Sequence, residues 1–428
     1  MNLADIIDTF ISGDWGEESP TEDSPNAAYC VRGADIVPIT NHNFTDIPQR
    51  YVCDRTKETK LLAAGDLVIE KSGGSPTQST GRIVYVSEDL IKAKGNVVCS
   101  NFCTAFRVKA GWNPLYVYYY WQNIYNQGAF FNFEGKTSGI KNLQLDNALS
   151  AIDIEHLPLE KQNQIVASLA SIDEKIKVNR QINDNLEAMA KQLYDYWFVQ
   201  FDFPNEEGKP YKSSGGAMVW NDKLKREIPS CFEVVNLGNL CDFRNGINYS
   251  KDETGNNYQI VNVRNISSSR ILLDGEDFGV ITVPTSKAEN YVLKPDDIII
   301  ARSGCPGSTR LLLSPANTLF CGFIICCSPN DSSMRNYLVY CLKQLEGTNA
   351  TTSGGSILQN VSQDTLKGLH IIVPEKQIID NFNKTIELIF ARMLNCLKES
   401  KALTKLRDEL LPLLMNGQAL VNYHLSAC

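Results

Sequence analysis

Two short segments carry residues that could hold a nucleobase or a nucleotide. Asn113-Pro114-Leu115-Tyr116 comes close to the Asn/Asp-Pro-Pro-Tyr box with which amino-methyltransferases hold a target base, but leucine replaces the second proline. No glycine-rich strand-turn-helix for S-adenosylmethionine accompanies it, and a helix N-cap followed by proline explains the segment. Gly135-Lys136-Thr137 resembles the end of a P-loop, yet the position five residues earlier, where glycine is required, is Phe130. We therefore predict neither methyl transfer nor nucleotide hydrolysis.

The sequence also lacks the residues that a metal site or a catalytic nucleophile would need. Pro295-Asp296 could begin a nuclease metal site, but residues 298–302 offer no acid-x-Lys to complete it. The four histidines are isolated, and Cys99 and Cys103 have no nearby histidine pair that would make a zinc site. No nucleophile elbow occurs. The sequence predicts a binding protein with no catalytic residue, metal or cofactor of its own; an enzyme with an unfamiliar site remains the alternative.

The totals are typical of a globular protein with two or three domains, since the chain has 428 residues, of which 43% are hydrophobic. The first ten residues lack the order of a signal peptide, and no apolar run is long enough to cross a bilayer. The 13 cysteines are irregularly spaced, which favours reduced thiols buried as small hydrophobic residues. We expect a cytoplasmic location.

The net charge of −8 argues against a simple basic nucleic-acid binder, but it does not describe every surface. Residues 71–145 contain eight lysines and arginines and only three acidic residues, so this stretch carries a net charge of +5. A basic face on an acidic molecule is one interpretation, and a solvated surface without a ligand is the other.

The chain repeats itself. LLAAGDLVIEKSGG at residues 61–74 matches VLKPDDIIIARSGC at residues 292–305, with an aspartate, an apolar run, a cation and Ser-Gly in each. Further matches follow in the same order, and loop insertions explain their drifting offset. The matching segments are 31–36 with 261–266, 137–139 with 352–354, and 157–162 with 373–377.

Each repeat has a mixed part followed by a long helix. The mixed part contains short strands, predicted at 66–70, 84–86, 298–301 and 323–326, and in the first repeat an aromatic helix that begins at Asn113-Pro114. The long helices begin just after Pro158 and Pro374. The connector, residues 203–229, is rich in Gly, Ser, Pro and Lys, with a short helical piece predicted at 222–227.

Both long helices carry apolar residues in steps of three and four over more than four heptads, which favours a coiled coil. About 40 residues of helix would form a rod of roughly 60 Å, long enough to hold two domains apart. Two unrelated amphipathic helices, each packed on its own domain, are the alternative. The predicted pairing residues are Ile172, Ile176, Asn179, Asn183, Leu186 and Leu193 in the first helix, and Ile389, Met393, Cys396, Leu403 and Leu410 in the second.

These features together resemble the specificity (S) subunit of type I restriction-modification systems, over essentially the whole chain. The Ser-Gly strand ends, the Thr-Ser-Gly loops and the Glu-Lys-Gln segments after proline carry the resemblance. The connector around Gly208–Gly216 with Val219-Trp220-Asn221, and Gly246–Ser250 near the start of the second half, are also similar to that family. The first half lacks a clear counterpart of Gly246–Ser250.

The resemblance implies an α+β fold in which two α/β target recognition domains are separated by two long antiparallel coiled-coil helices, as a pseudo-twofold internal repeat. The expected boundaries are 1–156 for recognition domain 1, 157–202 for the first spacer helix, 203–229 for the linker, 230–373 for recognition domain 2, and 374–428 for the second helix and tail.

The resemblance also implies a non-catalytic, sequence-specific DNA-binding subunit that reads a bipartite target in double-stranded DNA, one half-site per domain. Its implied partners are two modification subunits, which use S-adenosylmethionine, and restriction subunits, which use ATP and Mg²⁺; this chain itself binds no cofactor. The alternative is a scaffold that assembles a multi-subunit complex without binding DNA.

Loops at strand ends with glycine and a cation suit contacts to base edges and phosphates. A glycine turn that merely closes a hairpin is the alternative for each. The candidate DNA-binding residues are Lys71, Ser72, Gly73, Arg82, Lys136, Thr137, Ser138, Lys141 and Asn142 in the first repeat, and Arg302, Ser303, Gly304, Arg310, Thr352, Ser353 and Gln359 in the second.

Overall fold

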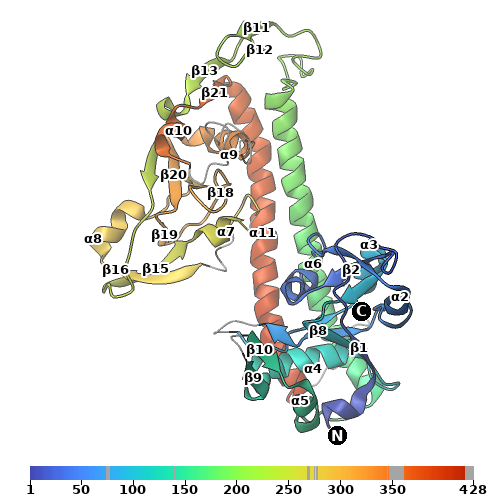
Figure 1. Cartoon of the computed structure of the whole chain (residues 1–428). Coiled ribbons are helices and arrows are strands. Elements are labelled where there is room, and N and C mark those ends of the chain that lie inside the picture. Colours follow the sequence, from blue (N-terminus) through green and yellow to red (C-terminus); the bar gives the residue numbers. More distant parts are fainter. Residues whose placement is uncertain are drawn as a thin grey trace, which may run out of the picture. The chain divides into compact units, whose positions relative to one another are not determined.

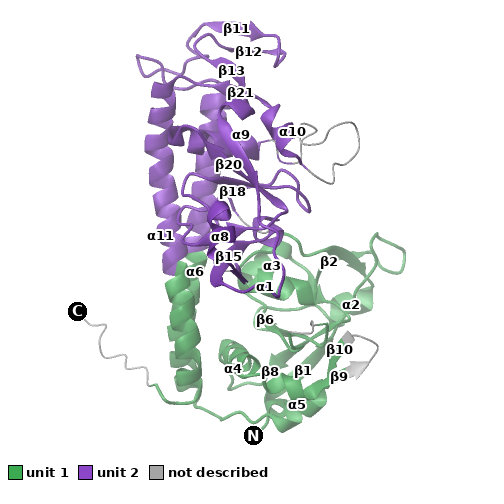
Figure 2. Ribbon diagram, turned by 90° about the vertical axis from the view of Figure 1, so that its left-hand side faces the viewer, with its two compact units in different colours: residues 1–178, 400–428 green, residues 179–399 purple. Residues whose placement is uncertain are grey.

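The computed structural model divides into two compact units, unit 1 (residues 1–178 and 400–428) and unit 2 (residues 179–399) (Figure 2). It describes residues 1–73, 78–137, 140–267, 270–273, 275, 278–344, 346 and 361–419, with only the backbone for residues 136, 137 and 140. Within these residues, none of the helices is apolar over enough of its length to traverse a bilayer.

Two of the sheets in unit 1 share a core (Figure 1). The four-stranded antiparallel sheet has the order β1 (Ile7–Ser12), β8 (Cys103–Val108), β4 (Leu67–Glu70), β6 (Ile83–Tyr85). In the three-stranded sheet, β2 (Asn26–Val31) lies between antiparallel β3 (Gln49–Val52) and parallel β7 (Val97–Cys99). Strand β4 is buried on both faces: Val68 contributes to the core shared with β2 and β7, while Leu67 and Ile69 contribute to the core formed with an aromatic helix.

Unit 2 has the same topology. Its four-stranded sheet has the order β14 (Cys241–Asn245), β20 (Ile324–Pro329), β17 (Ile298–Ala301), β18 (Thr309–Leu311). In its three-stranded sheet, β15 (Asn256–Val261) lies between antiparallel β16 (Gly279–Val283) and parallel β19 (Thr318–Phe320). Ile298 and Ile300 again contribute to one core and Ile299 to another. The sequence repeat therefore corresponds to a repeated strand order.

The aromatic helix is α4 (Pro114–Asn126), and it begins where the sequence predicts. The side chain of Asn113 accepts hydrogen bonds from the backbone N–H groups of Leu115 and Tyr116, and proline occupies the first turn. Its counterpart in unit 2 is α9 (Arg335–Lys343), which buries Tyr337 and Tyr340 as α4 buries Tyr116 and Tyr119. Apart from two long helices described next, the other α-helices are short: α1 (Ile36–Thr40), α2 (Asp54–Thr59), α3 (Glu88–Lys94), α5 (Leu145–Ala151), α7 (Val263–Ser267), α8 (Thr285–Ala288) and α10 (Gln363–Lys367).

Two long helices, α6 (Leu159–Tyr194) and α11 (Lys376–Met415), each contribute to both units. In unit 1, Ile165 and Leu169 of α6 share a core with Leu411 and Leu414 of α11. In unit 2, Ala190 and Tyr194 share a core with Phe382 and Ile386. In unit 1, Asp173 contacts Arg407, so a later residue of α6 meets an earlier residue of α11. In unit 2, Asn179 bonds to Glu399, whereas the later Ala190 and Tyr194 meet the earlier Phe382 and Ile386. The helices therefore run in opposite directions within each unit.

The residues predicted to pair the helices differ in burial. Ile172, Ile176, Asn179, Asn183, Met393 and Cys396 are buried, whereas Leu186, Leu193, Ile389, Leu403 and Leu410 are half-buried. Leu406, which the heptad pattern also places in the seam, is 44% exposed. Along α6, burial of these residues decreases after Asn183, and along α11 it decreases after Cys396.

Asn183 provides a stability prediction for this seam. It is 2% exposed, and its side-chain Oδ1 atom has no hydrogen-bond partner. Replacing Asn183 with leucine should raise the free energy of unfolding by about 1–2 kcal/mol, because a desolvated, unsatisfied acceptor is removed. Chemical unfolding would measure the change. Asn179→Leu is the matched control: its Oδ1 atom also lacks a partner, but its Nδ2 atom donates to Glu399 at 2.9 Å. Leucine there would remove that donor as well, so this substitution should stabilise the fold less than Asn183→Leu. Equal stabilisation by both variants would contradict the prediction.

The connector corrects one expectation. The helical piece predicted at 222–227 is wrong, because β11 (Met218–Asn221) and β12 (Arg226–Pro229) form a hairpin there. The side chain of Asn221 accepts from the backbone N–H groups of Lys223 and Leu224, and Lys225 has a φ of 52°. This local hydrogen bonding stabilises a turn in place of a helix. The connector is followed by β13 (Glu233–Asn236), which pairs with β21 (His370–Val373).

Candidate nucleic-acid interface

In unit 1 the candidate residues meet at the turn that follows β4. Ser72 and Gly73 form the short strand β5 (Ser72–Gly73), which pairs with β10 (Ile140–Leu143) at Asn142 and Lys141. Strand β10 pairs in turn with β9 (Glu134–Thr137), where Lys136 is opposite Lys141. Segments some 65 residues apart in sequence therefore form one small sheet. Of the predicted residues there, Ser138 lies outside the described residues, and only the backbone is described for Lys136 and Thr137.

A buried ion pair between Glu70 and Arg82 lies beside this turn. Glu70, whose side chain is 3% exposed, accepts a hydrogen bond from Arg82 Nε at 2.8 Å. The hydrogen bond to Glu70 raises the pKa of Arg82. A Cβ atom at Gly33 or Gly73 would lie within 3 Å of the Glu70 carboxylate. The absence of a side chain at both positions therefore provides the space that this carboxylate occupies. We therefore assign Arg82 a supporting role in place of a direct contact.

Lys141 is also engaged by a carboxylate. Its Nζ lies 3.1 Å from Glu134, which accepts from the backbone N–H of Thr80 at 2.7 Å as well. Burial alone would raise the pKa of Glu134, but the hydrogen bonds from Thr80 and Lys141 lower it. Lys71 differs: within the described residues, its ammonium group has no ion pair with a carboxylate. Among the described side chains of this turn, Lys71 is thus a cation that is available to a ligand.

A hollow of about 530 Å³ opens beside Lys71. The amide side chains of Gln144 and Asn147 line it together with Phe10 and Ser12. Amide groups and a lysine are among the side chains that hydrogen-bond to base edges.

Unit 2 presents the same turn after β17. The backbone N–H of Arg302 donates to the carbonyl of Phe323 at 2.8 Å, as that of Lys71 donates to Phe102 at 2.8 Å. The Arg302 carbonyl accepts from Val361 at 2.8 Å, as the Lys71 carbonyl accepts from Leu143 at 2.7 Å.

Arg302 and Gly304 are exposed, and Ser303 is half-buried. In the part of the chain that the structure describes, no ion pair engages the Arg302 guanidinium. Arg302 therefore occupies in unit 2 the place of Lys71 in unit 1.

Arg310 lies inside unit 2 and not at this turn. Its side chain is 7% exposed, and its Nη1 atom lies 2.8 Å from Glu346 and 2.7 Å from the Thr309 carbonyl. Like Arg82, Arg310 is placed to support the fold. Thr352, Ser353 and Gln359 lie outside the described residues.

The structure also supplies the missing counterpart of Gly246, which is Gly13. A Cβ atom at Gly13 would lie 1.9 Å from the Ser100 carbonyl oxygen, and one at Gly246 would lie 2.1 Å from that of Cys321. Both glycines therefore allow the same close approach of two backbones. Sequence comparison missed the pair because only the glycine is shared between Gly13-Asp14-Trp15 and the segment at Gly246.

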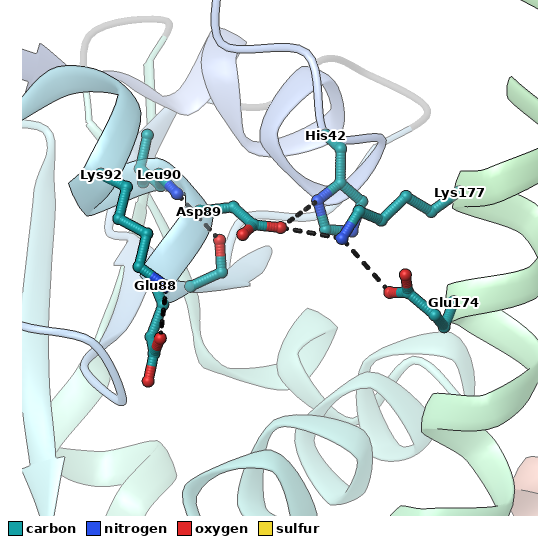
Figure 3. A network of polar contacts seen from close by, with 8 residues as sticks. His42, Glu88, Asp89, Leu90, Lys92, Glu174 and Lys177 are labelled. Carbon is teal, nitrogen blue, oxygen red and sulfur yellow. Dashed lines mark hydrogen bonds and ion pairs between the residues drawn. The ribbon is translucent and has the colours of Figure 1, made fainter. Parts of the chain in front are cut away.

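In both units, ion pairs and hydrogen bonds join α6 to neighbouring elements. In unit 1, Lys177 Nζ of α6 lies 2.8 Å from the carboxylate of Asp89 in α3 and 3.2 Å from that of Glu174 (Figure 3). His42 Nδ1 lies 3.9 Å from the Asp89 carboxylate. The hydrogen bond from Lys177 lowers the pKa of Asp89. Tyr119 of α4 donates to Asp173 at 2.6 Å, and this aspartate is also 3.0 Å from Arg407 of α11.

Unit 2 has the corresponding attachment to α6. Arg270 Nε donates to Asp184 at 2.7 Å, and the backbone N–H of Ile271 donates to Glu187 at 3.2 Å. In each unit, α6 therefore carries the acidic or basic side chain that orients the adjoining strands and loops.

Comparison with known proteins gives concordant results. The family profile described as "Type I restriction modification DNA specificity domain" matches residues 17–188 and 229–403. The chain is 25% identical over 279 residues to the type I restriction enzyme MjaIX specificity subunit of Methanocaldococcus jannaschii, covering 64% of this chain and 62% of that subunit. It is 24% identical over 323 residues to the HindI specificity subunit of Haemophilus influenzae, covering 64% and 70% of the two chains.

Among solved structures, the type I restriction-modification S subunit from M. genitalium is similar with a TM-score of 0.51. The identity is 15%, and the match covers 97% of this chain and 95% of that one. This likeness concerns the fold.

Proposed function

The chain belongs to the type I restriction-modification DNA specificity family, and we propose that it reads a bipartite DNA target, with unit 1 reading one half-site and unit 2 the other. The repeated topology supports this proposal, because two copies of one scaffold with different surface residues suit two half-sites of different sequence. The observation that carries it is the shared turn, where each unit places a cation that has no ion pair with a carboxylate within the described residues: the half-buried Lys71 in unit 1 and the exposed Arg302 in unit 2.

The long helices are proposed to set the spacing between the half-sites as an antiparallel coiled coil related by a pseudo-twofold axis. Helix α6 has 36 residues, so its length is about 54 Å. One turn of duplex spans about 34 Å, and a helix of this length that joins two readers would fix how far apart they bind. An unread spacer between the half-sites follows from this arrangement.

The partners are proposed on the basis of the family. Two modification subunits would bring S-adenosylmethionine and methylate adenine, and restriction subunits would bring ATP, Mg²⁺ and DNA cleavage. This chain would direct them to the target in the cytoplasm without contributing a catalytic residue. In this role, residues 1–156 and 230–373 would form the two recognition domains, and the long helices and the linker would connect them.

Arg302→Ala tests the proposed reading of DNA. In the complex with its modification subunits, the variant should lose roughly 5- to 150-fold in affinity at one half-site, because a good contact between arginine and a base contributes about 1–3 kcal/mol of discrimination. Competition binding with duplexes altered in one half-site at a time would measure it. Lys71→Ala should act on the other half-site.

Arg392→Ala is the matched control, because it removes an equal charge from an exposed position of α11. It should leave the preference for both half-sites unchanged. Equal loss at both half-sites in Arg302→Ala would indicate a structural role and contradict the proposal.

A further inference from the structure

Two exposed phenylalanines occupy the same position in the two units. Phe102 is 57% exposed and immediately precedes β8, and Phe323 is 63% exposed and immediately precedes β20. The carbonyl of Phe102 accepts the backbone N–H groups of Lys71 at 2.8 Å and Ser72 at 3.1 Å, and that of Phe323 accepts the N–H of Arg302 at 2.8 Å. The backbone of each phenylalanine therefore lies beside the backbone of the residue that carries the cation.

This exposure is not explained by the fold. Burying a phenylalanine side chain is favourable by about 1.5–3 kcal/mol, and the residues that follow these two, Cys103 and Ile324, are fully buried. The residues just before them differ between the units, Ser100-Asn101 in one and Cys321-Gly322 in the other. Both equivalent turns therefore expose a phenylalanine to solvent, although the residues just before it differ. This repeated exposure indicates that the ring contacts a ligand.

The turns that carry the two rings are held in place by hydrogen bonds. The backbone N–H of Cys103 donates to the Ser100 carbonyl at 2.9 Å, and that of Ile324 donates to the Cys321 carbonyl at 2.9 Å. Gly13 and Gly246 pack directly against the same Ser100 and Cys321 carbonyls. Because the backbone is fixed, little conformational freedom is left for a ligand to remove on binding.

We infer that the rings of Phe102 and Phe323 pack against nucleobases, each in the half-site read by its own unit, while Lys71 or Arg302 beside it contacts a phosphate or a base edge. Apolar side chains read bases by touching the thymine methyl group or by entering between stacked bases, and both bury the ring against base atoms. This inference rests on the proposed function and adds the residues that supply apolar base contact.

The test uses the complex with modification subunits and the target identified by methylome sequencing of cells that carry the wild-type chain. Phe102→Ala and Phe323→Ala should each weaken binding at least about fivefold and relax the preference for bases in one half-site only, a different one for each variant. Binding to an unrelated duplex and its dependence on salt should not change, because a phenyl ring neutralises no phosphate.

Val37→Ala and Val280→Ala are the controls, because these residues are 51% and 66% exposed but belong to α1 and β16 and not to the two turns. Neither control should alter binding. The melting temperatures of all four variants should match the wild type, since exposed residues are exchanged.

The inference is overturned if the phenylalanine variants bind like the wild type, or if they weaken binding to every duplex equally. Failure of the proposed function looks different, because the wild-type complex itself would then show no preferred sequence.

Discussion

Inserting four residues between Val178 and Asn179, together with four between Glu399 and Ser400, should lengthen the unread spacer of the DNA target by one to two base pairs and leave both half-sites unchanged. These positions are the boundaries between the two units. The ion pair of Asp173 with Arg407 and the hydrogen bond of Asn179 with Glu399 flank them, so the insertions preserve the contacts within each unit.

The arithmetic follows from helix geometry. Four residues add about 6 Å to each helix and rotate it by about 40° beyond a full turn. Two base pairs add about 7 Å to the duplex and rotate it in the same sense by about 70°. The added length and the added rotation of four helical residues therefore correspond approximately to those of one to two base pairs. The original target should then be bound no better than non-specific DNA, a loss of at least about 10³-fold.

Methylome sequencing of cells that express the variant would read the new target directly. Gln181→Ala with Lys401→Ala is the control, since it changes exposed positions of the same helices without adding length. The control should leave the target unchanged. Altered half-sites with the original spacer would contradict the role proposed for the helices.

Arg82→Met should destabilise unit 1 by about 3–5 kcal/mol, because it leaves the Glu70 carboxylate buried without its ion pair. A unit of this size should lose on the order of 10 °C in melting temperature, measured by differential scanning calorimetry. The turn at Lys71–Gly73 follows Glu70 directly in sequence, and a Cβ atom at Gly73 would lie 2.8 Å from the Glu70 carboxylate. DNA binding should therefore weaken at one half-site as well.

Two comparisons sharpen this prediction. Lys92→Met removes the partner of Glu88 in a pair whose side chains are 72% and 73% exposed, and it should leave the melting temperature unchanged. The double variant Glu70→Leu with Arg82→Met should recover most of the lost stability, because no buried charge is left unpaired. A double variant as unstable as Arg82→Met would show that packing by the arginine stem, and not its charge, is what unit 1 requires.

The elements that could be predicted from the sequence are those whose signals are local. The strand before Lys71 and its repeat before Arg302 follow from uninterrupted apolar runs, and α4 follows from Asn113-Pro114. The long helices follow from their period of three and four. Each of these signals depends only on neighbouring residues.

The surface of the candidate interface could not be predicted in the same way, because it depends on distant partners. Arg82 and Arg310 look like surface cations in the sequence, but Glu70 and Glu346 hold them inside their units. A glutamate at the end of an apolar strand, as in residues 67–70, is the one signal that a buried cation must lie nearby. Phe323 was placed within a predicted strand on its hydrophobicity, whereas β20 begins one residue later and leaves its ring in solvent.

Unit 1 is built from two stretches of chain that are separated by the whole of unit 2. Leu411 and Leu414, which complete its core beside α4, are made more than two hundred residues after α6 begins. At ordinary rates of translation, a ribosome needs roughly 10 to 40 s for that interval. During synthesis the apolar side of the first half of α6 therefore remains exposed to solvent. Until α11 has been synthesised, this surface can bind chaperones or pack incorrectly.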